Sequence, residues 1–449
     1  MIDEGLSNHF IECLIWMSTN QQQPFNGRFF HENMMSLSMA DRDASYMKLF
    51  NSWNNEGSPI AHLLDWIDLV EKGTISVEEE NIYLCALVLG WMLISTDNFL
   101  RDKVSVALCT LLRGHVSVML SILRAFENVN DSYIIERLYT IALGVVTFER
   151  ESSAVRELSI YIYEKIFSTA SVVVEDILVR DSAKEVIMYA LSLEEDGRID
   201  IGKVVGPYNS SFPDVPKDEE IEKYYLDYEK QGFKDYYWAQ NNILSSMQVD
   251  TKGYHYGDFG RYTFQRYFCD WNNLNASELM KIAIYDIFKK GYNVDIHGYF
   301  DRNINQYERI SERKIERIGK KYQWQSLYKL AAQVSDNYQR KNEAIGEMEY
   351  NTGAYEPRLR DFDPTVNQRN FVGKFGEMHD ISYNNYDLEH EVWLSTYDDL
   401  PLFRDLVKLN ISGKDYLSLY GYYEWKESTP LGMEAVSYTH LRAHETLAN

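Results

Sequence analysis

The sequence predicts a mainly α-helical protein in which antiparallel helices form an extended array, followed by a second, more irregular α-rich region. Apolar residues recur at three- and four-residue spacing through most of residues 56–196, as on the buried stripe of a helix. Glycine and proline residues separate these segments into short helices joined by tight turns. An Arg-containing motif recurs at expected helix starts in steps of about 36 and about 43 residues, close to the ~40-residue period of HEAT and armadillo repeats. We therefore expect a HEAT/armadillo-like array.

The individual helices of the array follow from stripes and stop signals. Ile60, Leu63 and Ile67 form an apolar stripe that begins after Pro59 and ends at Gly73. Asn98 is a candidate N-cap for a helix that Gly114 would end. Further helices are expected at 77–96, 115–128, 132–148, 152–167, 172–178 and 182–193.

Composition divides the chain into segments. Glycine and proline residues between 197 and 220 break the helical periodicity and indicate a linker or long loop. Beyond it, helices are expected at 221–240, 262–271, 276–290 and 310–339, and a short strand at 391–394. The expected division is 1–55, an N-terminal segment; 56–196, helical repeats; 197–220, linker; 221–345, a Tyr-rich helical region; 346–434, an irregular region; and 435–449, a tail.

The tail differs in kind from the rest of the chain. Residues Ser437–Thr446 resemble a translated sequencing adapter over ten consecutive positions. Residues 435–449 are therefore expected to be non-native and are left out of the prediction of fold and function. The native protein is expected to continue past Glu434, so that this chain is a fragment of a longer one.

Charge and cysteine content restrict the function classes. The formal net charge of −23 disfavours binding to nucleic acid or to anionic membranes, except through a local basic patch. The four cysteines are far apart and form no CxxC pair, which indicates reduced thiols in a cytoplasm. The longest apolar stretch, 82–94, is about thirteen residues long, against the ~20 that a bilayer requires. We expect a cytoplasmic protein without membrane contact.

No catalytic motif is present in the sequence. It contains no GxxxxGK[ST] loop, no HExxH, no zinc-type Cys/His quartet and no GxSxG elbow. We therefore expect no catalytic residue, no metal and no cofactor in this chain. One enzymatic alternative stays open: Asp258, Asp301 and Glu316 would serve as acid/base groups if they converged on one pocket. A constitutive scaffold is a third alternative.

A basic cluster stands out in this acidic chain. Arg317, Lys320 and Lys321, with the nearby Trp324, are the candidates for binding a partner. Glutamates are interleaved with them, and Glu316 and Lys320 have the spacing of a pair on a helix surface. The cluster is either a solvated helix face or a contact surface for an anionic partner.

Arg–Asp pairs are expected to form a structural polar network. Arg101–Asp102 and Arg180–Asp181 lie at helix starts of the array, where they would form a ladder of charges between neighbouring repeats. The other candidates lie beside glycines and aromatic residues of the second region: Asp258, Arg261, Asp301 and Arg302.

Several strings together resemble one protein group. They are Leu100–Asp102, Asn130–Tyr133 with Glu136–Leu138, Val179–Asp181, Asp258–Tyr262, Phe300–Asn303, Glu316–Trp324 and Ser335–Asn337. In this order they resemble the C-terminal helical-repeat region of large prokaryotic STAND-type, NACHT-like antiviral NTPases of the AVAST type. The resemblance covers roughly residues 25–425, and Glu316–Trp324 is its most specific string.

The resemblance implies a sensor. In this group the repeats recognise a foreign protein ligand, often a viral one, and the NTPase then drives self-association and effector activation. Because this chain lacks a P-loop, ATP and Mg²⁺ are implied only for the NTPase of a full-length parent. The chain itself is expected to be the target-recognition segment, which binds protein rather than nucleic acid.

Overall fold

The computed structural model describes most of the first 364 residues and four strands beyond them. Described are residues 4–53, 55, 57–150, 152–168, 173–249, 257–271, 273–304, 315–341, 346–351, 359–364, 408–411, 413–417, 420–428 and 434–442. The chain divides into two compact units, Met1–Val366 and Asn367–Asn449. The described part contains seventeen α-helices, so the expected mainly helical class is confirmed. No helix among these residues is long and apolar enough to cross a membrane.

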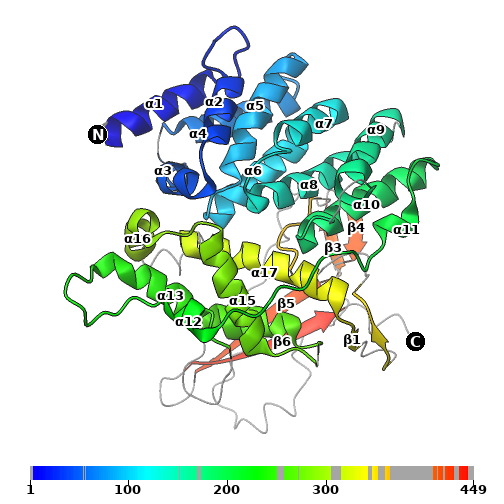
Figure 1. Ribbon diagram of the computed structural model, residues 1–449. Coiled ribbons are helices and arrows are strands. Elements are labelled where there is room, and N and C mark those ends of the chain that lie inside the picture. The colour runs from blue at the N-terminus through cyan, green and yellow to red at the C-terminus, as the bar shows by residue number, and fades with distance from the viewer. Residues whose placement is uncertain are drawn as a thin grey trace. The chain divides into compact units, whose positions relative to one another are not determined.

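Ten helices of the first unit form the array (Figure 1). They are α1 (Glu4–Met17), α2 (Gly27–Ser36), α3 (Met39–Asn51), α4 (Pro59–Glu71), α5 (Glu79–Met92), α6 (Asn98–Leu111), α7 (Val116–Ala125), α8 (Ser132–Val146), α9 (Ser152–Tyr163) and α10 (Ile177–Leu193). One row stacks α6 on α8 and α8 on α10, and a second row stacks α2, α5, α7 and α9. The rows share one apolar core that reaches to Val204, and α5 is buried almost all round. This two-row packing is the expected antiparallel array.

Acidic caps set the helix starts of the first row. The side chains of Asp97, Asp131 and Asp176 accept hydrogen bonds from the first backbone N–H groups of α6, α8 and α10. Such caps satisfy donors that have no partner within the helix. The prediction that Asn98 is the N-cap is therefore wrong by one residue. The predicted stop at Gly114 is confirmed by its φ of +76°, which a residue with a side chain rarely adopts.

A second layer packs on the array within the same unit. Its elements are α11 (Ile201–Val204), α12 (Asp218–Glu222), the 3₁₀ turn η2 (Asp235–Tyr237), α13 (Trp238–Ser246), the π turn η3 (Gly260–Gln265), α14 (Arg266–Phe268), α15 (Ala276–Lys289), α16 (Val294–Asn303), α17 (Ile318–Asn337) and the paired strands β1 (Arg340–Lys341) and β2 (Met348–Glu349). Helix α17 lies between the array and α15 (Figure 1), and it contacts α8 and α10 as well as α13, α15 and α16.

Several expected elements differ from the observed ones. The two helices predicted at 172–178 and 182–193 are wrong as separate elements. Residues 173–176 are not helical, and one helix, α10, runs without a break from the N-cap Asp176 through Leu193. A continuous helix over 221–240 is wrong, since turns occupy 223–234. Helices α1, α2, α3 and α16 are not predicted at all. Residues 310–314 of the helix predicted at 310–339 lie outside the described part, residues 315–317 are not helical, and α17 covers 318–337.

The second unit is described only as two hairpins. Strand β3 (Lys408–Ile411) pairs antiparallel with β4 (Lys414–Leu417), and β5 (Tyr420–Ser428) pairs antiparallel with β6 (Glu434–Arg442). Strand β6 thus includes residues 435–442, which the sequence assigns to a non-native tail. The strand predicted at 391–394 lies outside the described residues.

Replacing Gly260 with alanine should destabilise the second layer. A Cβ at this position would lie 2.3 Å from the carbonyl oxygens of Met247 and Gln248, so backbone would have to move. We expect Gly260→Ala to lower the free energy of unfolding by about 1–3 kcal/mol, measured by denaturant titration. The matched control is Gly197→Ala, where an added Cβ meets nothing within 4 Å. Equal stability of the two variants would contradict the close packing.

Candidate functional site

The predicted basic patch lies at the start of α17, but its members have different environments. Arg317 is the N-cap residue and is half-buried. The Lys320 ammonium lies 3.3 Å from a Glu316 carboxylate oxygen and remains partly exposed, as expected for a pair on a helix surface. Trp324 packs edge-on against Phe259 and stacks on Tyr328. Three further basic residues just before this patch, Arg309, Arg313 and Lys314, lie outside the described part.

Lys321 corrects the expectation that the patch faces a partner. Its side chain is fully buried, and its Nζ lies 2.7 Å from Asp43 Oδ1 and 2.7 Å from Asp131 Oδ2. Both carboxylates are also fully buried. A charge removed from water in this way requires opposite charges beside it. Lys321 therefore joins α17 to α3 and α8 inside the molecule and cannot contact a ligand from this position.

The two carboxylates around Lys321 are not equivalent. Asp131 caps α8, and it also accepts a hydrogen bond from Gln325 Nε2 at 2.8 Å. Burial raises the pKa of Asp43 to about 6, an effect that the Lys321 ammonium opposes and the neighbouring Asp131 reinforces. One ammonium between two carboxylates leaves an excess negative charge, which disfavours the ionised form of Asp43.

The four polar residues predicted around the second region do not form one network. Asp301 is buried and caps α17, because its carboxylate accepts hydrogen bonds from the Ile318 and Gly319 N–H groups at 2.5 and 2.9 Å. Arg302 makes a paired, exposed contact with Asp235. Asp258 is exposed and accepts from the Phe259 N–H, while the Arg261 guanidinium lies over the Tyr262 ring. Each of the four residues thus has its own, separate contacts.

The Arg–Asp pairs of the array do contact neighbouring helices. Arg101 of α6 donates to Glu136 of α8 at 2.6 Å, and Arg137 of α8 donates to Asp102 of α6 at 2.9 Å. These crossed contacts form the ladder between α6 and α8.

On α10 the pattern changes. Arg180 lies 3.0 Å from Asp336 of α17. Asp181 accepts from Arg360, which belongs to the short segment 359–364.

Sequence reasoning missed a related pair, Arg42–Asp43, on α3. Arg42 donates to the carbonyl oxygens of Met34 and Leu37, which end α2. Arg101 likewise donates to Leu93 O at the end of α5. In α3, α6 and α10 the arginine is the fourth residue after a polar N-cap, Ser38, Asp97 or Asp176. That spacing is the sequence signal that would have found Arg42.

The enzymatic alternative required three carboxylates to share a pocket. Asp258 is exposed, Asp301 is buried beneath the start of α17, and Glu316 pairs with Lys320. Each is held by different partners. Among the described residues, no group of three or more histidine, cysteine, aspartate or glutamate side chains is arranged to hold a metal ion.

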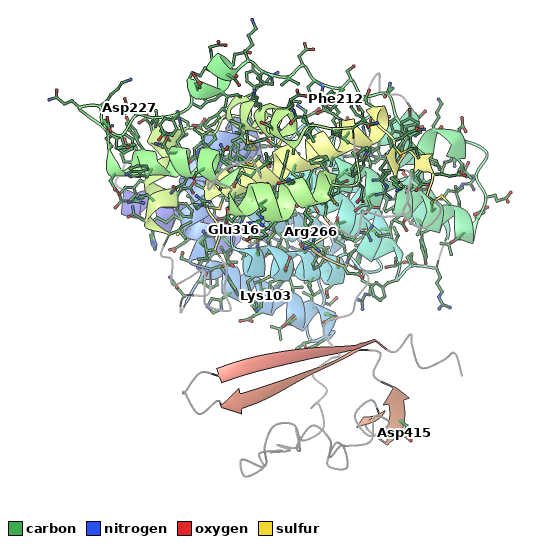
Figure 2. All side chains as sticks on the ribbon, turned by 90° about the horizontal axis from the view of Figure 1, so that it is seen from below. Lys103, Phe212, Asp227, Arg266, Glu316 and Asp415 are labelled. Atoms are coloured by element: carbon green, nitrogen blue, oxygen red, sulfur yellow. The ribbon has the colours of Figure 1, made fainter. Side chains whose placement is uncertain are left out.

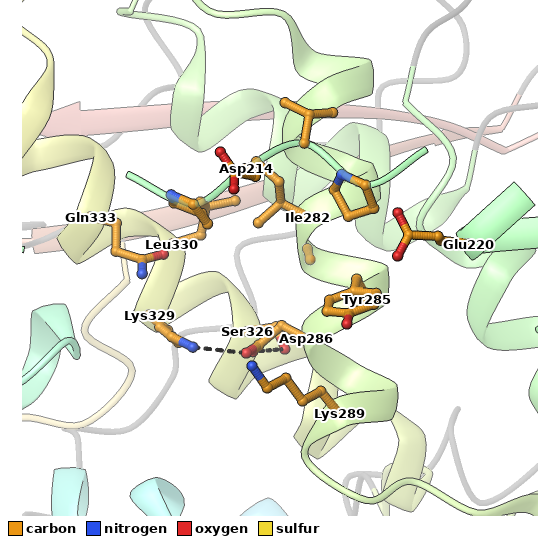
Figure 3. A pocket seen from close by; sticks show the side chains of 14 residues that line it. Asp214, Glu220, Ile282, Tyr285, Asp286, Lys289, Ser326, Lys329, Leu330 and Gln333 are labelled. Carbon is orange, nitrogen blue, oxygen red and sulfur yellow. Dashed lines mark hydrogen bonds and ion pairs between the residues drawn. The ribbon is translucent and has the colours of Figure 1, made fainter. Parts of the chain in front are cut away.

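A pocket of about 380 Å³ lies between residues 213–220 and helices α15 and α17 (Figure 3). One carboxylate of its lining, Asp286, is already paired, because it accepts from Ser326 at 2.8 Å and from Lys329 at 3.0 Å. The linker contributes Pro213, Val215 and Pro216 to the lining, together with Asp214. These contacts join the linker to the second layer, and they are typical of structural packing.

Among the described residues of the second layer, four tyrosines are more than half exposed, and three of them lie on the turns at 223–234 and on α16; the fourth, Tyr262, lies on η3. We define the tyrosine surface as Tyr225, Tyr228, Ile296 and Tyr299, whose side chains are 53, 52, 43 and 73 % exposed. Asp227, between the two first tyrosines, lies at a protruding end of the unit (Figure 2). Helix α16 packs on η2 and α13, which follow the turns directly.

The backbone under the tyrosine surface is held in place. Asn241 of α13 accepts from the Leu226 N–H at 2.9 Å and donates to the Leu226 carbonyl at 2.7 Å. Tyr228 stacks on Trp238 with ring centroids 5.4 Å apart. Arg302 of α16 ties down η2 through Asp235. The surface therefore presents exposed aromatic rings on an ordered support.

The buried ion triad makes a prediction about two adjacent lysines. Lys321→Glu would place a third carboxylate between Asp43 and Asp131, so we expect a loss of about 3–5 kcal/mol in the free energy of unfolding. Lys320→Glu changes only a partly exposed pair and should cost about 1 kcal/mol or less. Denaturant unfolding of both variants measures the difference. Similar losses would show that Lys321 is not the buried member.

The raised pKa of Asp43 predicts a pH dependence. Since the folded pKa of about 6 exceeds the ordinary value of 3.8, the folded protein binds a proton that the unfolded chain releases. The contribution of Asp43 to stability should therefore rise as pH falls from about 7 to about 4, by at most about 1.4 kcal/mol per pH unit. Asp43→Asn should remove this component from stability curves measured across that range. An unchanged pH dependence in the variant would contradict the assignment.

Comparison with known proteins gives no match. No protein-family model, no curated protein and no solved structure is similar to this chain at a significant level. Its function is therefore inferred from the geometry described above and from the resemblance carried by its motifs.

Proposed function

We propose that this chain is a protein-recognition module, and that it belongs to the target-recognition region of a prokaryotic STAND-type antiviral NTPase. The observation that carries the first part is the tyrosine surface on its ordered support. The helical array agrees with a recognition role, because arrays of stacked helices present extended surfaces. The second part depends on the resemblance of the motif strings, of which Glu316–Trp324 forms the start of α17.

A protein ligand is favoured by the chemistry of the tyrosine surface. Tyrosine offers a large apolar ring with a hydroxyl group and is enriched among residues that dominate protein–protein binding energy. The segment 223–238 carries three lysines and three acidic residues, so it has no net charge that would favour a polyanion. The backbone contacts of Asn241 reduce the ordering cost of binding.

The enzymatic alternative has less support. Its three carboxylates are engaged with different partners, and Asp301 uses both oxygens to cap α17. The proposal assigns ATP and Mg²⁺ to the NTPase of the parent protein and none to this chain. It also assigns ligand-driven self-association to the full-length parent protein.

Removing the tyrosine surface should abolish recognition while leaving the fold intact. In the complete gene, Tyr225→Ser, Tyr228→Ser and Tyr299→Ser together should reduce ligand binding by about 10²-fold or more, at about 1–2 kcal/mol for each residue that contributes to the interface. The measurement is growth arrest when single phage proteins are co-expressed with the complete gene. Thermal unfolding of the variant should match that of the wild type, because these side chains are more than half exposed.

The matched control for this experiment is Tyr262→Ser, another exposed tyrosine (63 %) that lies outside the tyrosine surface. It should leave the response unchanged. A response that survives the triple change, or one that the control removes equally, would count against the tyrosine surface as the recognition site.

The parent protein can be tested separately. Complete genes that contain this sequence should encode a GxxxxGK[ST] motif upstream of the position of Met1, followed by the array. Sequencing such genes decides this point. A complete gene without that motif would remove the NTPase assignment and leave the recognition module standing.

A further inference from the structure

Two separate apolar cores lie within the first unit. One is built by α1–α10 with Val204, and the other by α13, α15, α17 and their neighbours. Among the described residues, the array contributes only four buried apolar side chains to the second core: Met39, Met47, Ile177 and Leu178. The array and the second layer therefore have largely independent interiors, as two domains would.

Charged and polar groups fill much of the boundary between these cores. We define the seam as Lys321, Gln325 and Asp336 of α17 together with Asp43, Asp131 and Arg180 of the array. Lys321 pairs with Asp43 and Asp131, and Arg180 pairs with Asp336, with every one of these side chains at most 3 % exposed. Asp336 also accepts from the Tyr208 N–H and the Ser210 hydroxyl.

A seam of this composition fixes the position of the second layer on the array more than it stabilises the contact between them. The energy needed to remove ions from water offsets most of their attraction, so a buried ion pair contributes little net stability and mainly specifies the arrangement of its partners. When such a boundary opens, its charged groups regain water, whereas an apolar boundary would expose surface that water disfavours. A polar seam between two separate cores is therefore a boundary that can open without unfolding either side.

The charges around Lys321 come from every element packed at this point. Helix α3 supplies Arg42 and Asp43, α8 supplies Asp131 and Tyr133, and α17 supplies Tyr322 beside Lys321. On α16, His297 lies within hydrogen-bonding distance of the Ala40 carbonyl, and burial lowers its pKa, which favours the neutral ring. Lys321 is thus the cation shared by two carboxylates from two array helices.

We propose that the array and the second layer separate along the seam as two folded bodies, and that Lys321 is the latch that holds them together. The array side of the opened seam presents Asp43, Asp131 and Arg180, and the second-layer side presents α17. Helix α16 carries part of the tyrosine surface and also packs on α3, which supplies Asp43 to Lys321. A ligand bound to the tyrosine surface would therefore contact a helix that lies next to the latch. The proposal does not depend on the identity of any ligand.

The test is hydrogen exchange on the full chain carrying Lys321→Met, which keeps the length of the side chain and removes its charge. At pH 7.5 the repelling carboxylates should open the seam. We expect protection to fall about tenfold or more in α15 and α17, with less than about twofold change in α5 and α7 of the array core. At pH 5, protonation of Asp43 should remove its repulsion of Asp131. Protection, corrected for intrinsic exchange rates, should therefore recover.

The matched control is Lys329→Met, which removes a lysine that pairs with Asp286 within the second layer. In this variant the difference in hydrogen-exchange protection between the array and the second layer should be the same as in the wild type. Loss of protection in α5 and α7 together with α17 would overturn the proposal, because it would mean one cooperative body. Unchanged protection in α17 of Lys321→Met would overturn the role of the latch.

The wild-type chain provides a second measurement if Lys321→Met does not fold. Native-state exchange at rising denaturant should show α15 and α17 opening at a lower free energy than α5 and α7. Equal opening free energies for all four helices would overturn the proposal without any variant.

Discussion

Burial of the Lys321 ammonium between Asp43 and Asp131 determines how the two layers of the first unit fit together. A single cation contacts carboxylates from α3 and α8, and α17 has to place it within hydrogen-bonding distance of both. Any shift of α17 along the array would leave at least one ion buried without a partner, which is among the most costly errors a fold can contain. Asp336 with Arg180 repeats the constraint near the other end of α17. Between these two points the helix has one allowed register.

The same logic explains why the first row of the array is rich in charge at its helix starts. Asp97, Asp131 and Asp176 cap their helices, and Arg101, one turn after Asp97, donates to the Leu93 carbonyl at the end of α5. Carboxylates are stabilised at helix N-termini and guanidinium groups near exposed carbonyl oxygens. The polar groups therefore bind backbone ends that the turns leave without partners, and the apolar core remains between the two rows.

Sequence patterns predicted the part of the fold that is local. Helices α4–α9 follow from apolar stripes, as does the second part of α10, and the stop at Gly114 follows from the need for positive φ. The prediction of a continuous helix over 221–240 is wrong. Ring stacking between Tyr228 and Trp238 and the hydrogen bond from the Leu226 N–H to Asn241 favour turns over a helix.

Lys321 shows a different limit of sequence analysis. A sequence in which glutamate and lysine alternate gives the same pattern whether the helix face is solvated or buried. The partners that decide between these states lie 278 and 190 positions away in the chain. The sequence predicted only that residues 221–345 are rich in tyrosine, since the exposure of Tyr299 depends on where α16 packs.

The crossed contacts between α6 and α8 constrain how this architecture can change over evolutionary time. Arg101 requires Glu136 from the next helix of its row, and Arg137 requires Asp102 from the previous one. Duplication or loss of one helical pair between them would leave a buried guanidinium facing a neighbour that lacks its acid. Copy number in this array is therefore not freely adjustable, unlike in repeat proteins whose modules interlock through identical apolar faces. Diversification of such a protein is expected to proceed by substitution on its outer surfaces.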